Sequence, residues 1–122
     1  MKTSNSQPIL IVDPDTHFRS ELYNFLLSAG YENVDSARTF TEALEKVEES
    51  EYYVVVLDAA SHFESGVRSA DSITGLSPKT KVILMVDPDD RPGQQTNTGN
   101  RRQYLIKAMF TRNLLYLIEK DP

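Results

Sequence analysis

The chain has no cysteine, and this absence excludes several kinds of chemistry at once. Without thiols there is no disulfide framework, no thiol nucleophile and no cysteine-bound metal, and a reducing compartment is compatible with the sequence. No apolar run approaches the roughly 18 residues of a membrane span. The polar start, Met1 to Gln7, also lacks the apolar core of a secretory signal. We therefore expect a cytoplasmic protein that does not enter the membrane.

Positive charge is also scarce. The chain has 13 lysines and arginines against 18 acidic residues, a net charge of −5. Proteins that bind nucleic acid usually present a basic face, so we expect no direct nucleic-acid binding. The 122 residues, 39% of them hydrophobic, fit one domain with a single core. We expect one domain over residues 1–122, with a flexible N-terminus at residues 1–7.

Three unbroken apolar runs each lead into a carboxylate. Such runs, rich in β-branched residues, are typical of strands buried on both faces of a parallel sheet. In chain order they are Ile9–Val12 before Asp13, Tyr52–Leu57 before Asp58, and Val82–Val86 before Asp87. We also expect a weaker strand near Asn33 to Ser36 and a short one at Tyr104–Ile106 that ends at Lys107.

Most of the remaining chain has apolar residues at the spacing of an amphipathic helix. The expected helices start at an Asp15 or Thr16 cap, at a Thr39 capping box with Glu42, at about Gly66 and at a Thr111 cap. The first is expected to stop at Gly30 and the third at about Leu76, after a loop from Ala59 to Ser65. Strands that alternate with helices predict an α/β fold with a doubly wound parallel sheet.

One long stretch has nothing to bury. Between Val86 and Tyr104 there is no hydrophobic side chain. An amphipathic helix packed on the sheet is therefore excluded there, and we expect a polar loop at residues 87–103. A helix that would normally stand between these two strands is expected to be missing or replaced by this loop.

The predicted strand ends bring charged groups together. In a parallel sheet, Asp13, Asp58, Asp87 and Lys107 would all lie at the carboxyl edge, where ligands bind. The repulsion between clustered carboxylates is reduced when they bind a hard cation such as Mg²⁺ or when one of them takes up a proton. A lysine beside them can pair with an acid or with a phosphate. An acid between a metal and an ammonium is well placed to attack phosphorus and form an acyl phosphate.

These residues, in this order, resemble the receiver domain of two-component response regulators, and the resemblance runs from Ile9 to Glu119. It implies a flavodoxin-like, CheY-like sheet with strand order 2-1-3-4-5. It identifies Asp58 as the phospho-acceptor for a sensor histidine kinase and Lys107 as the lysine that senses the phosphoryl group. The implied Mg²⁺ ligands are Asp13, Asp58 and the backbone carbonyl of Ala60. Asp87 and Tyr104 fall on the switch positions.

The sequence also departs from the family pattern, as expected for an atypical receiver. Pro14 replaces the second acid of the metal site, and Asp87 replaces a hydroxyl residue that would bind the phosphoryl group. Ala108 replaces the proline after the lysine, although Gly66 falls where a glycine is expected. One hypothesis is that Asp87 pairs permanently with Lys107 and mimics the activated state.

Three functions remain open from the sequence. The first is a receiver that takes phosphate on Asp58 from a histidine kinase and signals to an output domain or partner protein, with a homodimer as one option. The second is a pseudo-receiver, a protein-interaction module that does not switch by phosphorylation. The third, a Mg²⁺-dependent hydrolase, needs a general base and a substrate pocket that the sequence does not show, so we expect no enzyme activity. His17 and His62 are expected to be exposed and without a role.

Overall fold

The computed structural model describes residues 6–90 and 102–120, and these form a five-stranded sheet with the order β2-β1-β3-β4-β5. All neighbouring strands are parallel. The strands are β1 (Ile9–Val12), β2 (Val34–Ala37), β3 (Val54–Asp58), β4 (Lys81–Val86) and β5 (Arg102–Ile106). The predicted strand order is therefore confirmed.

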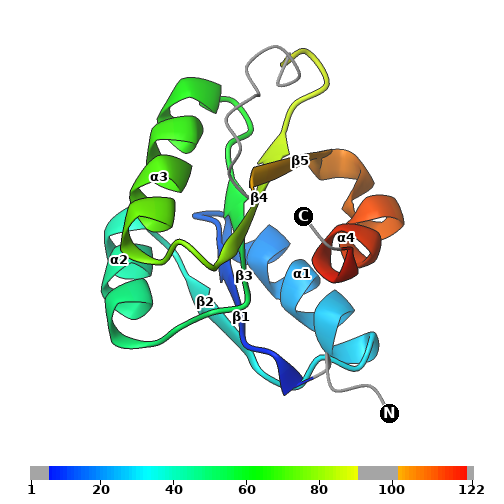
Figure 1. Cartoon of the computed structure of the whole chain (residues 1–122). Coiled ribbons are helices and arrows are strands. Elements are labelled where there is room, and N and C mark those ends of the chain that lie inside the picture. The colour runs from blue at the N-terminus through cyan, green and yellow to red at the C-terminus, as the bar shows by residue number, and fades with distance from the viewer. Residues whose placement is uncertain (1–5, 91–101, 121–122) are drawn as a thin grey trace.

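Helices cover both faces of this sheet. They are α1 (Thr16–Ser28), α2 (Phe40–Glu49), α3 (Phe63–Leu76) and α4 (Phe110–Glu119). Helices α2 and α3 lie on one face, on the left of Figure 1, and α1 and α4 lie on the other. The predicted doubly wound α/β fold is confirmed. Within the described residues, no helix is long and apolar enough to span a bilayer.

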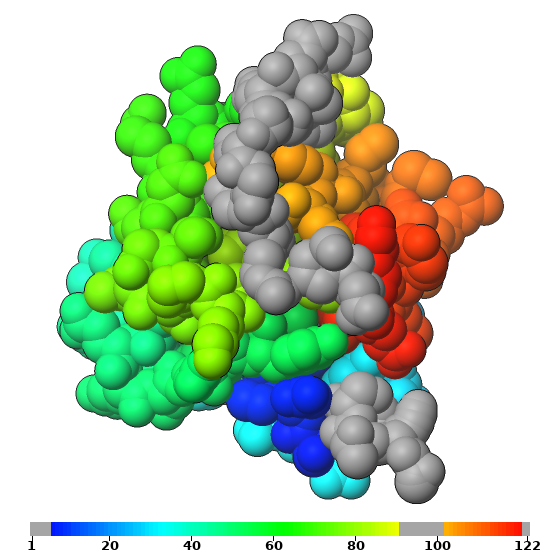
Figure 2. All heavy atoms as spheres, viewed as in Figure 1, coloured from blue at the N-terminus to red at the C-terminus, as the bar shows by residue number. Residues whose placement is uncertain are grey.

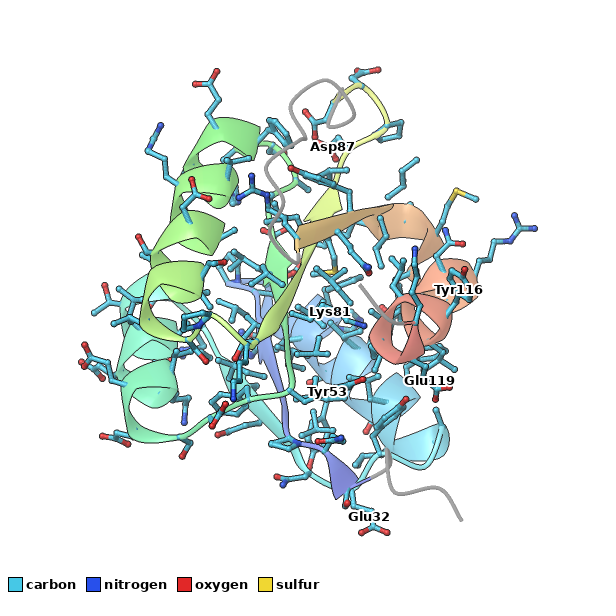
Figure 3. The ribbon with its side chains drawn as sticks, in the orientation of Figure 1. Glu32, Tyr53, Lys81, Asp87, Tyr116 and Glu119 are labelled. Atoms are coloured by element: carbon cyan, nitrogen blue, oxygen red, sulfur yellow. The ribbon has the colours of Figure 1, made fainter. Side chains whose placement is uncertain are left out.

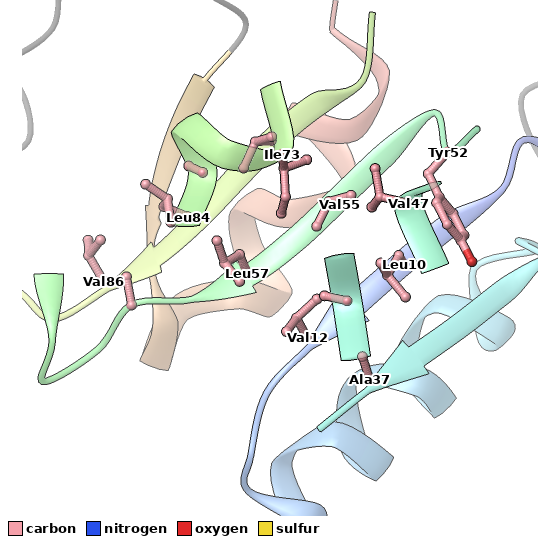
Figure 4. Packing of buried hydrophobic residues seen from close by; sticks show 14 residues of the cluster. Leu10, Val12, Ala37, Val47, Tyr52, Val55, Leu57, Ile73, Leu84 and Val86 are labelled. Carbon is pink, nitrogen blue, oxygen red and sulfur yellow. The ribbon is translucent and has the colours of Figure 1, made fainter. Parts of the chain in front are cut away.

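The alternation of side chains along each buried strand builds two cores. Leu10 and Val12 of β1 point towards α2 and α3, whereas Ile9 and Ile11 belong to the cluster under α1 and α4. Figure 4 shows the first cluster, in which residues of β1, β3 and β4 meet Val47 of α2 and Ile73 of α3. Burial on both faces explains why these strands read as continuous apolar runs.

Local caps start the first two helices where the sequence predicts. The Asp15 side chain accepts hydrogen bonds from the backbone N–H groups of His17 and Phe18, at 3.0 and 3.2 Å. Thr39 Oγ1 accepts from the Glu42 N–H at 3.1 Å. These bonds satisfy donors that a helix N-terminus otherwise leaves unpaired. Gly30 follows α1 with φ 101°, a left-handed conformation that favours glycine.

Two elements start earlier than expected. Helix α3 begins at Phe63 and not near Gly66, so the predicted loop from Ala59 to Ser65 is wrong for its last three residues. The ring of Phe63 packs on the core and against Tyr104, which favours a helical start there. Strand β5 begins at Arg102, which pairs with Val82 of β4, so residues 102 and 103 are not part of a loop.

The predicted cap of the last helix is also wrong. Thr111 lies inside α4, which begins at Phe110 directly after a 3-10 turn at Lys107–Met109. No side chain caps this helix, because the turn itself leads into it. Residues 91–101 of the predicted polar loop lie outside the described residues, and so do residues 1–5 of the predicted flexible N-terminus. The expectation of a missing helix between β4 and β5 falls largely on that undescribed segment.

A buried lysine ties α4 to the sheet. Lys81, at the start of β4, is 2% exposed. Its ammonium donates to the backbone carbonyls of Leu117, Ile118 and Lys120 at 2.7, 2.9 and 2.6 Å. Figure 3 shows Lys81 beside α4. A cation at a helix C-terminus satisfies free carbonyls and opposes the negative end of the helix dipole, so this contact fixes the position of α4.

Two glycines of α3 give a matched test of the packing between this helix and β3. A Cβ added at Gly66 would overlap the side chain of Ala59, whereas one added at Gly75 meets nothing within 4 Å. We expect Gly66→Ala to lower the free energy of unfolding by about 1–3 kcal/mol through overpacking. Gly75→Ala should raise it by up to about 1 kcal/mol through helix propensity. Urea unfolding of both variants measures the two effects, and equal stabilisation by both would contradict the packing.

Candidate functional site

The carboxyl edge of the sheet brings Asp13, Asp58 and Lys107 together. Val12 of β1 pairs with Leu57 of β3, so the acids that follow lie side by side. Lys107 comes directly after β5 and extends its side chain between them. Its Nζ lies 2.9 Å from Asp13 Oδ2 and 3.1 Å from Asp58 Oδ1. One ammonium therefore bridges the two carboxylates.

Burial and neighbouring charges shift the pKa values of the groups in this bridge. Burial raises the pKa of Asp13, which is 0% exposed, and the charge of Asp58 raises it further. The Asp15 N–H, which donates to Asp13 Oδ1 at 2.9 Å, and Lys107 oppose this shift. For Lys107, burial lowers the pKa, but the contacts with Asp13 and Asp58 and the negative charges of these two acids together outweigh burial, and the net shift is upward. Lys107 therefore stays protonated across the physiological range.

An aromatic ring contacts the ammonium of Lys107, and further rings support it. Lys107 Nζ lies 4.4 Å from the ring centroid of Phe18 in α1, a cation–π contact. Phe18 packs edge to face on Phe110 of α4, at 5.3 Å between centroids, and Phe110 packs in the same way on Phe25, at 5.1 Å. The packing of α1 against α4 thus limits where the ammonium can go.

The remaining contacts of Asp58 come from the loop after β3. The Ala60 N–H donates to Asp58 Oδ1 at 3.2 Å, and His62 Nε2 lies 3.3 Å from Asp58 Oδ2. The side chain of His62 is 41% exposed, as the sequence predicts. Its contact with Asp58 was nevertheless missed, although a histidine four residues after a strand-end acid is a signal that could have indicated it. His17 is exposed on α1.

Asp87 does not pair with Lys107. Its Oδ2 accepts a hydrogen bond from the Ser61 N–H at 2.8 Å, and its own N–H donates to Asp90 at 2.9 Å. Ser61 has φ 73°, which turns its N–H towards β4. The hypothesis of a permanent Asp87–Lys107 pair is therefore wrong for this structure, because Asp87 fastens the loop after β3 while Lys107 contacts the other two acids. Figure 3 shows Asp87 at the edge of the sheet far from Glu32.

The side chain of Tyr104, in β5, packs against the start of α3. Its ring is partly buried, 6.1 Å from the ring of Phe63 between centroids. Its hydroxyl accepts a hydrogen bond from Arg102 Nε at 3.2 Å, and Arg102 pairs with Asp71 of α3. Tyr104 therefore connects the end of the sheet to the start of α3, close to the loop that carries His62. A rotamer change on activation stays a prediction.

The side chains at this edge offer few uncommitted ligands to a magnesium ion. Asp13 and Asp58 share one ammonium, and Pro14 has no ligand atom in its side chain. Asp15, the nearest replacement, uses its Oδ1 to cap α1. In the part of the chain that the structure describes, no group of three histidine, aspartate or glutamate side chains is arranged to hold a metal ion. Mg²⁺ usually needs several oxygen ligands in near-octahedral geometry, and this edge offers few that are uncommitted.

Comparison with known proteins gives consistent matches. The transcriptional regulatory protein ZraR of Escherichia coli K12 is 30% identical over 120 residues, which is 97% of this chain and 27% of the relative. The same figures hold for ZraR of Escherichia coli O157:H7. This chain therefore spans 27% of the length of the curated relatives that it matches.

Solved structures with a similar fold are described as receiver domain proteins. A CheY-like receiver domain protein from Methanospirillum hungatei has a TM-score of 0.77 and 26% identity, over 93% of this chain and 91% of that one. A receiver domain protein from Clostridium thermocellum has a TM-score of 0.78 and 23% identity, over 92% and 90%. The second likeness shows the fold alone. The family model described as "Response regulator receiver domain" matches residues 9–119, so this chain belongs to the receiver domain family of two-component response regulators.

Proposed function

We propose that this receiver domain is a protein-interaction module whose conformation does not depend on Mg²⁺ or on phosphorylation of Asp58. The observation that carries the proposal is the Lys107 ammonium, 2.9 and 3.1 Å from the two site carboxylates. An internal cation already neutralises charge that a metal would otherwise neutralise. Its partners are an output domain or a separate protein of the same signalling pathway.

The surroundings of Asp58 oppose a phosphoryl group. A phosphoryl group on Asp58 adds negative charge beside the buried Asp13 carboxylate and near Asp87, which the Ser61 N–H holds at the same edge. Repulsion between close charges costs on the order of a few kcal/mol in partly screened surroundings. Where the family has a hydroxyl group to donate to the phosphoryl oxygens, Asp87 can only accept. The acyl phosphate would therefore be formed with difficulty.

A second function is favoured by one observation. The pKa of Asp13 is raised chiefly by burial, so the one ammonium leaves part of its charge uncompensated. An additional cation at this edge would therefore be stabilised. In this second proposal Asp58 accepts the phosphoryl group of a phosphohistidine on a sensor kinase. Asp13, Asp58 and the Ala60 carbonyl would hold Mg²⁺, which would neutralise charge on the phosphoryl oxygens.

Titration with Mg²⁺ and beryllofluoride, a phosphate mimic, separates the two functions. We expect no saturable change in the backbone amide shifts around Asp58, Asp87 and Lys107 at millimolar Mg²⁺, with or without the mimic. Shifts that need both reagents and disappear in Asp58→Asn would contradict the first proposal and establish the second.

The matched control restores the family pattern. The double variant Pro14→Asp with Asp87→Thr adds an oxygen ligand at the metal position and removes a carboxylate near the phosphoryl position. We expect this variant to gain a saturable response to the two reagents. Its response shows that the assay detects binding. A silent wild type then means that the Lys107 ammonium suffices at this site when position 14 adds no ligand and position 87 adds no hydroxyl group.

The charge of Asp13 predicts a pH-dependent effect on stability. A folded-state pKa above the unfolded value of 3.8 means that ionisation of Asp13 disfavours the folded state as the pH rises above 3.8. We expect Asp13→Asn to raise the free energy of unfolding at neutral pH relative to wild type. The advantage should shrink as the pH falls towards 3.8 and disappear well below it, where Asp13 is neutral in both states. Denaturant unfolding over this range tests it, and a variant that is less stable at pH 7 would show that the pair with Lys107 outweighs the cost of burial.

A further inference from the structure

A groove lies at the opposite edge of the sheet, between the C-terminal ends of α2 and α3. Its volume is about 460 Å³. The segments that form it, residues 48–51 and 76–79, adjoin on the left side of Figure 2 in blue-green and yellow-green. They precede β3 and β4, so the groove is at the amino edge of the sheet, whereas Asp58 is at the carboxyl edge. The groove is lined by Val47, Glu48, Glu49, Ser50, Glu51, Leu76, Ser77, Pro78 and Lys79.

Negative charge surrounds this groove. Glu48, Glu49 and Glu51 are exposed on its rim, with Lys79 as the one basic residue of the lining. Glu48 and Glu49 stand in the last turn of α2, at the negative end of the helix dipole, where acidic side chains are unfavourable. Lys46 of the same turn pairs with Asp35 of β2. Helix α3 ends at the same groove and has no basic residue in its last turn. Two helix C-termini and three carboxylates therefore produce a field that attracts a cation.

The groove also has apolar surface. Leu76 is 46% exposed, one of four large hydrophobic residues that stand out from the described surface. Val47 and Pro78 line the groove beside it. An exposed apolar side chain within a charged rim is the pattern of an interface, in which the apolar contact is central and the charged groups lie around it.

The groove is formed in advance by hydrogen bonds below it. Thr80 Oγ1 donates to the Tyr52 carbonyl at 2.7 Å and lies 2.6 Å from Ser77 Oγ. The Ser77 N–H donates to the Ile73 carbonyl at 2.8 Å, and the Thr80 N–H donates to the Ser77 carbonyl at 3.0 Å. A partner would therefore find the turn from α3 to β4 already in place, which lowers the entropic cost of binding.

We propose that this groove binds a positively charged segment of a partner protein that inserts one apolar side chain beside Leu76. The charge favours this occupant over a second copy of the chain, which has a net charge of −5 and would be repelled. The proposal uses no residue of the Asp58 site. It adds to the proposed function a docking surface that does not depend on phosphorylation.

The test uses a short synthetic peptide of leucine and lysine, with a matched peptide of leucine and glutamate, titrated into the ¹⁵N-labelled chain. We expect the lysine peptide alone to give saturable amide shifts centred on residues 47–51 and 76–79, weaker at high salt. Leu76→Ser should weaken binding by about tenfold, as loss of a central apolar contact does. Glu48→Lys with Glu49→Lys should abolish it.

Matched controls lie on other surfaces of the chain. Leu27→Ser removes a leucine of similar exposure from α1, and Glu21→Lys with Glu32→Lys makes the same change in net charge. These controls, and Asp58→Asn, should bind like wild type.

Shifts spread over the whole acidic surface, shifts centred on α1 or α4, or binding that survives Leu76→Ser would overturn the proposal. Shifts at the groove produced by raising the protein concentration alone would also overturn it, because they would identify a second copy as the occupant. A negative peptide titration does not change the outcome of the Mg²⁺ and beryllofluoride titration. The docking proposal and the proposed function can therefore be contradicted independently.

Discussion

The contact of one ammonium with two carboxylates determines how the carboxyl edge of this receiver domain is organised. Lys107 joins the end of β5 to the ends of β1 and β3, and its ammonium lies over the ring of Phe18. The carboxylates would repel each other at this distance without a cation, and the lysine supplies the cation within the chain. Its position depends in turn on the packing of α1 against α4, because Phe18 and Phe110 are in contact. The charge at the site and the packing of these helices are therefore linked.

The two edges of the sheet differ in chemistry. At the carboxyl edge the acids are engaged within the chain: Lys107 pairs with Asp13 and Asp58, Asp87 accepts from the Ser61 N–H, and Asp15 caps α1. At the amino edge, Lys81 satisfies the end of α4, whereas Glu48 and Glu49 stand in the last turn of α2 and the last turn of α3 has no basic residue. A chain whose usual switch site is internally neutralised still presents a charged surface elsewhere, and this is consistent with a role in binding other proteins.

Much of the fold followed from local sequence, for identifiable reasons. Strands buried on both faces have no polar interruption, so β1, β3 and β4 were evident, and Asp15 and Thr39 marked two helix starts by capping. The early start of α3 was missed because His62 makes no capping bond, and the start of β5 because Arg102 is placed by pairing with β4. The meeting of Asp13, Asp58 and Lys107 followed from parallel topology. The Asp87–Ser61 bond was not predictable, because it depends on a left-handed turn at a serine.

The protonation of Lys107 is the most direct test of the internal cation. Its pKa can be followed by the ¹³Cε chemical shift in metal-free protein labelled at lysine. The account predicts a midpoint above the ordinary value of 10.5, because the contacts with Asp13 and Asp58 and their negative charges together outweigh the effect of burial. The midpoint should fall in Asp58→Asn, which keeps the shape of the site and removes one charge. A midpoint at or below 10.5, or one that is unchanged by this substitution, would show that the ammonium does not neutralise the two acids.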